Sequence, residues 1–376
     1  MRVRAPVLEN DIPLFMAIHY GTISAVEAAL EAGANVNGHP DQPYAPVAGA
    51  IFRQNTGVVN CLLEHGADPD KPVTVDVLFP SGVNGKSILG ARALHLAIMI
   101  DNVEIMNLLL KSSRADPNAT GNNDTTPLMI ACSRKCISVE VVRLLLEAGA
   151  DPALADDKGV IPLHIVAEFD MPELIDMLHS KAPGTLNRCK SDGMTPLFVA
   201  CYQGQESTVS KLLSLGAMQP GPSDESVMCP LAATVDKGFV GVVRVLLNEG
   251  GMKAIGGKDA LHTSIVMAII DRRGMILRLL LTADGVKGRS ELANSHDKNG
   301  YLLHYGASCC YPPAVSILLE AGADEAVRCR MAFTARDVIG FGFRPKVPTD
   351  RGDAVAIRRM LQRGPAYRAR SWAWPS

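Results

Sequence analysis

The chain of 376 residues contains few aromatic side chains, because Phe, Trp and Tyr together make up only 5% of it. Large globular cores depend heavily on such side chains, so their scarcity favours small, closely packed helices. Apolar residues nevertheless reach 47%, which is enough to bury a core. The length allows one to three globular domains or one long array of repeats.

Long apolar runs are also missing from the sequence. The longest, such as Ser264–Ile270, fall far short of the ~20 residues that a membrane-spanning helix needs. The first residues, MRVRAPVLENDIP, contain no apolar run of signal-peptide length. Nine irregularly spaced cysteines indicate reduced thiols and not a disulfide framework. We therefore expect a soluble protein of the cytoplasm, with a nuclear location also open, that does not bind membranes.

Charge of one sign does not dominate either. The net charge of −2 argues against bulk attraction to nucleic acid. Acidic and basic residues alternate along the expected loops, so no continuous basic stripe would follow a phosphate backbone. The C-terminal end is basic, which we interpret as charge on a terminal cap; its residues are Arg344, Lys346, Arg351, Arg358, Arg359, Arg363, Arg368 and Arg370.

What the sequence does contain is a repeat. A Pro-Leu, Pro-Val or Ala-Leu dipeptide recurs with a period of 33–34 residues, interrupted by two long insertions, and Gly-Ala recurs at the same step. Such self-similarity is the signature of a repeat architecture. The opening dipeptides begin at Pro13, Pro46, Ala93, Pro127, Pro162, Pro196, Pro230 and Ala260, and return in degenerate form at Leu302 and Ala335.

Each part of the repeat has a physical reason. Thr126 and Thr195 precede a proline and are placed to cap a helix by accepting a hydrogen bond from its first turn. Proline at the first helical position loses no bond. Apolar residues at helical spacing, as in Val141–Leu146, predict a second helix that ends at a glycine. One repeat buries too little apolar surface to fold alone, so the repeats must stack.

These stretches resemble the ankyrin repeat family. The matching segments include TPLMIAC…VVRLLLEAGADP, IPLHIVA…LIDML, MTPLFVACYQGQ…LLSLGA, ALHLAI…VEIMNLLL and PLFMAI…VEAALEAGANVN. The resemblance implies an all-α solenoid of stacked antiparallel helix pairs joined by projecting β-hairpin loops. It covers about residues 10–364, which corresponds to about nine repeats plus a degenerate C-terminal cap.

The repeats set the expected boundaries. Residues 1–10 form an N-terminal extension and residues 11–364 the repeat domain, with a long loop at Pro72–Gly90 and an insertion at Gly340–Gly352. Residues 365–376, PAYRARSWAWPS, form a basic tail with two tryptophans, which is either frayed or a docking motif. The repeats lie near residues 11–43, 44–90, 91–124, 125–158, 159–192, 193–226, 227–258, 259–299, 300–332 and 333–364.

Candidate chemical residues have structural explanations. The family resemblance implies that the recurring histidines after the opening dipeptide bind loop backbone; they are His95, His164, His262 and His304. Cys132 and Cys136 share a helix spacing, but no four-ligand zinc layout accompanies them, and Cys132 fills a small-residue position. Cys136, Cys309 and Cys310 are expected in turns, where exposure would allow oxidation. Gly82–Ser87 ends in Gly-Lys-Ser without the strand and first glycine of a phosphate-binding loop. We expect no metal, cofactor or catalysis.

The remaining candidates point to partner binding. The resemblance implies that partners contact the hairpin tips and the turn after the first helix, and aromatic side chains there would be binding hot spots. These residues are Tyr20, Phe52, Phe169, Tyr202, Phe239 and Tyr311. Asn37 resembles the hairpin asparagine that is hydroxylated in some family members, although an asparagine also simply suits a turn.

The sequence therefore favours a monomeric, non-catalytic scaffold that binds another protein through hairpin tips and a concave groove. An adaptor that recruits a client to an enzyme complex, such as a ubiquitin ligase, is the alternative, and it would place a recruitment motif in the cap or tail. The identity of the partner is not encoded in the fold.

Overall fold

The computed structural model describes residues 11–39, 42–74, 89–112, 114–133, 139–218, 229–250, 255, 257–282, 289–297, 300–340 and 351–361. The chain divides into two compact units. The N-terminal unit comprises Met1–Val166, Glu173–Thr185 and Cys189–Asp192, and the C-terminal unit comprises Ala167–Pro172, Leu186–Arg188 and Gly193–Ser376. Cys136, the tail at residues 365–376 and most of the two long insertions lie outside the described residues.

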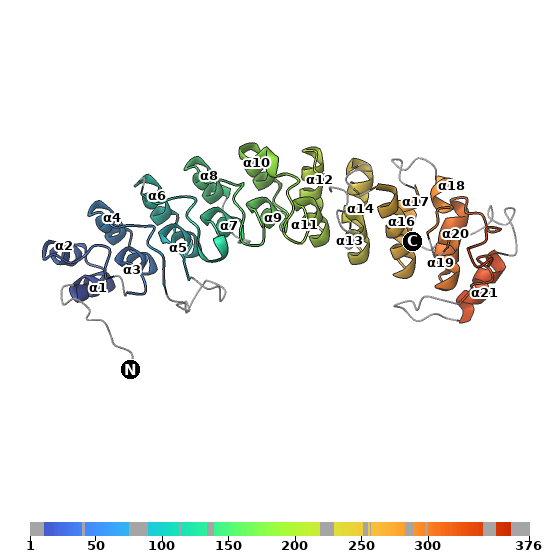
Figure 1. Cartoon of the computed structure of the whole chain (residues 1–376), viewed down its shortest axis with the longest axis horizontal. Coiled ribbons are helices and arrows are strands. Elements are labelled where there is room, and N and C mark those ends of the chain that lie inside the picture. Colours follow the sequence, from blue (N-terminus) through green and yellow to red (C-terminus); the bar gives the residue numbers. More distant parts are fainter. Residues whose placement is uncertain are drawn as a thin grey trace, which may run out of the picture. The chain divides into compact units, whose positions relative to one another are not determined.

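The N-terminal unit is built from pairs of short helices. The first helices, α1, α3, α5, α7 and α9, pack side by side in one layer, and α2, α4, α6 and α8 follow one another in a second layer (Figure 1). The bounds are α1 Asp11–Tyr20, α2 Ile23–Glu31, α3 Pro46–Phe52, α4 Thr56–Glu64, α5 Ala93–Met99, α6 Val103–Lys111, the 3₁₀ turn η1 Asn122–Asp124, α7 Pro127–Cys132, α8 Val139–Glu147, α9 Pro162–Val166, α10 Pro172–Lys181 and the 3₁₀ turn η2 Pro183–Thr185.

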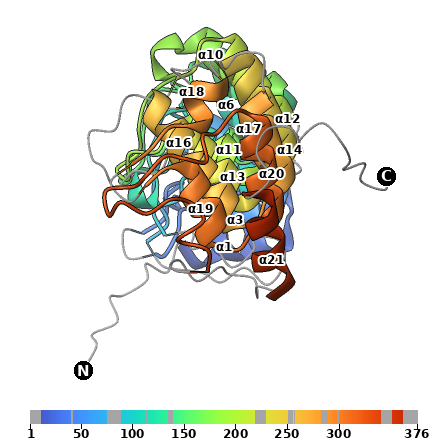
Figure 2. The ribbon, with the colours of Figure 1, turned by 90° about the vertical axis from the view of Figure 1, so that its right-hand side faces the viewer.

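The C-terminal unit repeats the same two layers. Helices α11, α13, α16 and α19 form one layer, α12, α14, α17 and α20 form the other, and α21 packs on α20 (Figures 1 and 2). The bounds are α11 Pro196–Gln203, α12 Glu206–Ser214, α13 Pro230–Lys237, α14 Val240–Val245, the π-helical segment η3 Leu246–Gly250, α16 Gly257–Ile270, α17 Gly274–Thr282, α18 Arg289–Ala293, α19 Leu302–Ser308, α20 Pro312–Glu320 and α21 Arg351–Met360.

The predicted helix caps are confirmed. The Thr126 hydroxyl accepts a hydrogen bond from the Met129 amide at 3.3 Å, and Thr195 accepts one from Phe198 at 3.2 Å. Cys229 stands where those repeats have threonine, and its Sγ lies 3.2 Å from the Ala232 amide. A sulfur atom thus takes over the role of the hydroxyl at the start of α13.

The structure differs from the sequence prediction at three places. Helix α16 begins at Gly257, one turn before Ala260. The stretch after Thr334, predicted to open a tenth repeat, forms turns, because the Asp337 carboxylate accepts hydrogen bonds from the Thr334 amide and hydroxyl. The loops of the described residues contain no β-strand, only an isolated antiparallel bridge between His296 and Tyr301. The number of repeats and their boundaries stay predictions.

Replacing Thr195 with alanine is expected to lower the free energy of unfolding by about 1 kcal/mol, because the buried cap of α11 loses its acceptor. Cys229→Thr should raise stability, since a hydroxyl is a better acceptor than a thiol. Urea unfolding followed by circular dichroism measures both. Thr263→Ala, in an exposed position within α16, is the control and should change little. An unchanged Thr195→Ala midpoint would contradict the cap.

Candidate functional site

The turn between the two helices of a pair has one recurring conformation. A residue with positive φ stands just before the second helix, and in several pairs it is not glycine. This left-handed backbone aims the following residue back toward the preceding repeat. The positive-φ residues are Gly21, Gln54, Asp101, Gly204, Gly238, Arg272 and Cys310.

In four of the described helix pairs, the residue just before the second helix donates a hydrogen bond to the turn of the preceding repeat. Asn55 Nδ2 donates to the Gly21 carbonyl at 3.0 Å, and Gln205 Nε2 donates to the Glu168 carbonyl at 2.8 Å. Arg273 donates to the Asp236 carbonyl, and the Tyr311 hydroxyl donates to the Arg272 carbonyl at 3.0 Å. This position therefore joins consecutive repeats within each unit, and we call these contacts the turn links.

The turn links change the interpretation of two predicted aromatic residues. Tyr311 occupies the linking position and is only 8% exposed, so the prediction that it lies on an exposed face is wrong. Phe239 occupies the same position, half-buried, with its ring against Gly204. Both side chains connect repeats.

Phe52 and Phe169 are also half-buried. The ring of Phe52 packs edge-to-face on Tyr44, with 5.3 Å between centroids. The Phe169 carbonyl accepts a hydrogen bond from the Thr208 hydroxyl at 3.0 Å. The six predicted aromatic residues follow their opening dipeptides by six, seven or nine positions, so they do not share one direction.

The two tyrosines at the ends of first helices are exposed. Tyr20, the last residue of α1, is 71% exposed. Tyr202, in the last turn of α11, is 42% exposed and stacks on Phe198 with 6.2 Å between centroids. Lys237 Nζ lies 4.5 Å from the centroid of the Tyr202 ring. We call Tyr202 and Lys237 the tyrosine–lysine pair; sequence reasoning missed Lys237, although it ends the first helix of the next repeat.

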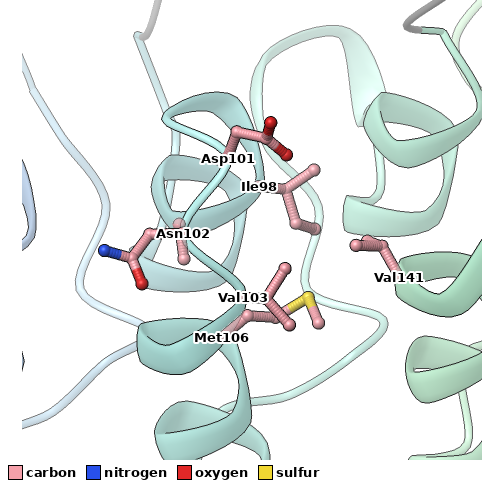
Figure 3. Close-up of a pocket in the computed structure, with 7 residues that line it drawn as sticks. Ile98, Asp101, Asn102, Val103, Met106 and Val141 are labelled. Atoms are coloured by element: carbon pink, nitrogen blue, oxygen red, sulfur yellow. The ribbon is translucent and has the colours of Figure 1, made fainter. Parts of the chain in front are cut away.

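A shallow hollow lies at the same kind of turn in the N-terminal unit. The side chains of Ile98, Val103, Met106 and Val141 surround it, with Asp101 at its rim (Figure 3). Its space of about 200 Å³ includes open solvent, which is less than small-molecule sites usually offer. The hollow is therefore too shallow to enclose a cofactor.

The recurring histidines bind loop backbone in most repeats. His95 Nδ1 accepts from the Arg92 amide at 3.2 Å, and its Nε2 pairs with the Thr125 carbonyl at 3.0 Å. His164 Nδ1 accepts from Ile161, and His304 Nε2 pairs with the Phe333 carbonyl at 2.9 Å. His262 differs: its Nδ1 lies 2.8 Å from Ser295 Oγ. The earlier start of α16 places His262 inside the helix, away from a free helix end.

Three of the cysteines singled out from the sequence, Cys132, Cys309 and Cys310, lie out of water. Cys309 and Cys310 are buried, so the expectation that they are exposed is wrong. Burial raises the pKa of both thiols, and it raises the pKa of Cys132 to about 12. A raised thiol pKa disfavours the thiolate, the form that reacts. No group of three or more His, Cys, Asp or Glu side chains in the described ranges is arranged to hold a metal ion.

Asn37 takes part in a contact between loops. Its Oδ1 accepts a hydrogen bond from the Asp68 amide at 2.6 Å, and its carbonyl accepts one from Lys71 Nζ at 2.9 Å. Asn118, Asn187 and Asn294 make the same side-chain contact to Asp151, Met218 and Asp324. The structural role of this asparagine is therefore clear, and its modification stays a prediction.

Comparison with known proteins agrees with this arrangement. A family model described as ankyrin repeats (3 copies) matches residues 72–156, 138–224 and 163–256. The chain is 26% identical to the Drosophila melanogaster transient receptor potential cation channel subfamily A member 1, over 88% of this chain and 29% of that protein. It is 30% identical to the human B-cell lymphoma 3 protein, over 63% of this chain and 50% of that protein.

A third relative is an enzyme by name. The chain is 30% identical to palmitoyltransferase AKR1 of Debaryomyces hansenii, over 48% of this chain and 24% of that protein. The chain thus spans half or less of the length of these relatives. None of the helices in the described residues is both long and apolar enough to cross a membrane.

Proposed function

This chain belongs to the ankyrin repeat family, and we propose that it is a non-catalytic scaffold that binds a protein partner. Ankyrin repeats generally mediate protein–protein interaction. The partner would contact the turns after the first helices and the loops between repeats. We further propose that the chain acts as a monomer in the cytoplasm, without a cofactor.

The tyrosine–lysine pair is the observation that carries this proposal. The Tyr202 ring is exposed, yet Phe198 and the Lys237 ammonium group hold it on two sides. A tyrosine fixed before binding loses little conformational entropy when a partner covers it, and tyrosines of this kind are frequent binding hot spots. Lys237 adds a positive charge beside an apolar ring.

The enzyme relative does not favour catalysis by this chain. The match covers 24% of that palmitoyltransferase, so the shared part is compatible with a repeat region alone. The recurring histidines of the described residues serve loop backbone in most repeats, as shown for His95, His164 and His304. A binding function therefore agrees better with the placement of these residues.

The binding proposal predicts a specific loss. Tyr202→Ala and Lys237→Glu are each expected to weaken partner binding at least tenfold, because they remove a preformed ring and a charge from the surface. Affinity purification of the full chain identifies the partner, and titration of the purified partner measures the affinity.

The controls alter exposed side chains that lie on second helices and not at the end of a first helix. They are Met275→Ala on α17 and Arg244→Glu on α14. They should leave the affinity within about twofold, as exposed positions outside hot spots usually do. If the Tyr202 and Lys237 variants melt normally and bind as tightly as the controls, the turn is not the binding surface.

The adaptor alternative depends on the tail at residues 365–376, which contains Trp372 and Trp374. Tryptophan and arginine are both enriched among binding hot spots. Deleting residues 365–376 should release an enzyme complex but retain the client if the adaptor reading is right. If the same proteins co-purify with the deletion variant, the adaptor hypothesis is wrong and the scaffold proposal stands.

A further inference from the structure

The loop at residues 328–333, Arg-Cys-Arg-Met-Ala-Phe, is held in one conformation by its own hydrogen bonds. The Cys329 amide donates to the Phe333 carbonyl at 2.9 Å, and the Ala332 amide donates to the Cys329 carbonyl at 2.8 Å. The Arg328 guanidinium donates to the Ala332 carbonyl at 2.8 Å. We call this segment the arginine–methionine loop.

A histidine of the repeat fixes this loop to the helix layers. The Phe333 carbonyl accepts from His304 Nε2 at 2.9 Å as well as from the Cys329 amide. His304 lies in α19 and is buried. The loop is therefore anchored on a packed helix, and its conformation exists before any partner binds.

This anchored loop exposes apolar side chains. Met331 is 77% exposed and Phe333 is 47% exposed. Covering large apolar side chains that a rigid loop holds in water lowers the free energy, so these side chains favour binding of a partner. Arg330 and Arg336 are exposed on either side of them in the sequence. The Asp337 carboxylate beside Arg336 offsets part of its charge, so Arg330 is the main positive charge next to the apolar tip.

The charge of the C-terminal sequence favours an anionic partner. Residues 326–376 contain eleven Lys and Arg against three Asp and Glu, a net charge of +8. Since the whole chain has a net charge of −2, residues 1–325 carry −10. The near-neutral total therefore hides a strongly basic end, and the arginine–methionine loop is at its start.

We propose that the arginine–methionine loop docks an acidic segment of a protein partner that also carries apolar side chains. The acidic groups would pair with Arg330 and Arg336, and an apolar side chain would cover Met331 and Phe333. This inference rests on the proposed protein-binding function and adds the chemistry of the partner.

A narrow protein segment fits these observations better than an anionic bilayer. A bilayer presents a broad, flat surface, whereas the loop offers only two exposed apolar side chains and two exposed arginines. A peptide segment can contact the loop alone. Two exposed apolar side chains also supply little insertion energy compared with the several signals that stable membrane attachment needs.

The test uses the full chain and a fluorescein-labelled twelve-residue peptide of Asp, Glu and Leu. We expect saturable binding by fluorescence anisotropy that weakens as salt rises from ~50 to ~300 mM, because salt screens exposed charges. Arg330→Glu and Met331→Ser should each weaken binding at least tenfold. A peptide with Ser in place of Leu should also bind the unmodified chain at least tenfold more weakly.

Matched variants separate this loop from general charge effects. Arg114→Glu and Met275→Ser change exposed residues of the same types elsewhere and should bind the peptide within twofold of the unmodified chain. Equal weakening in all four variants, or no binding of the peptide, overturns the proposal. Met331-dependent binding of vesicles of phosphatidylcholine with phosphatidylserine, without peptide binding, assigns the loop to membranes and also overturns it.

Two further measurements complete the test. If sedimentation shows self-association that Arg330→Glu abolishes, while the peptide does not bind, a second copy is the occupant and the proposal fails. The Tyr202→Ala variant should still bind the peptide. If the peptide does not bind but Tyr202→Ala still weakens partner binding, only the loop proposal is contradicted. If Tyr202→Ala binds the partner normally, the proposed binding surface is contradicted instead.

Discussion

Arg272→Ala is expected to lower the free energy of unfolding of the C-terminal unit by about 3 kcal/mol, since it removes hydrogen bonds from a charged donor, worth roughly 1.5–3 kcal/mol each. Arg272 Nη2 donates to the Cys310 carbonyl at 3.0 Å and lies 3.4 Å from the Cys309 carbonyl. The same nitrogen lies 3.5 Å from Asp353 Oδ2 in α21. One side chain thus connects the turn before α17, the turn before α20 and the last described helix.

The environment of Arg272 explains why this effect exceeds that of a surface ion pair. Its side chain is 16% exposed and that of Asp353 is 28% exposed, so both groups are mostly out of water. The guanidinium carbon lies 5.5 Å from the centroid of the Tyr311 ring, which adds a cation–π contact. Removing one member of a buried pair leaves the other charge without compensation.

Hydrogen exchange of α20 and α21, together with urea unfolding, measures the effect. Arg278→Ala is the control, because Arg278 pairs with Glu320 at 3.8 Å with both side chains about half exposed, and such pairs contribute ~0–1 kcal/mol. Arg272→Lys should recover part of the loss, since lysine keeps the charge without the planar fork. Equal protection of α21 in Arg272→Ala and Arg278→Ala would contradict this role.

Acidification from pH 7 to pH 4 is expected to destabilise the N-terminal unit by about 3 kcal/mol through His95 alone. Burial lowers the pKa of His95 from 6.5 to about 4. The unfolded chain therefore takes up a proton below pH 6.5 that the folded chain does not take up until about pH 4. The neutral ring's contribution is complete above pH 6.5 and is lost across that interval, at ~1.4 kcal/mol per pKa unit.

The hydrogen bonds of His95 fix the sign of this effect. Nδ1 accepts from the Arg92 amide and Nε2 pairs with the Thr125 carbonyl, so Nε2 carries the proton of the neutral ring. Protonating Nδ1 would break the bond to Arg92 and bury a charge. Urea midpoints between pH 7 and pH 4 should fall steeply for the unmodified chain and less steeply for His95→Gln.

A variant with reduced stability but an intact His95 serves as the control for pH. Thr126→Ala removes a helix cap of the same unit without removing a titrating group, so its pH dependence should parallel that of the unmodified chain. A parallel pH dependence in His95→Gln would show that other groups cause the acid sensitivity. Urea midpoints at pH 7 alone would not show whether His95 or other groups cause the acid sensitivity.

The sequence predicted the helix layers because their causes are local. Thr126 and Thr195 cap helices through their own first turns, and the period of the opening dipeptides places the buried leucines, as at Leu128 and Leu197. These features need no knowledge of distant residues. The repeat family followed from the same local pattern.

The candidate site was less predictable because its exposure depends on one or two positions in a turn. Tyr202 and Phe239 both lie near the end of a first helix in the sequence, but the left-handed residue falls between their two structural positions. Tyr202 precedes it and faces water, whereas Phe239 follows it and packs on Gly204. Cys309 and Cys310 are buried for a different reason: distant residues, Arg272 and Gly340, contact their turn.

The turn links also set how far a disturbance travels. They join residues 34 to 39 positions apart, such as Asn55 to Gly21 and Tyr311 to Arg272, so the repeats that they join are coupled directly. A substitution that destabilises one repeat therefore affects its nearest neighbours most, and the effect decreases with each further repeat. Each unit can therefore unfold partially from one end while the repeats at its other end stay folded.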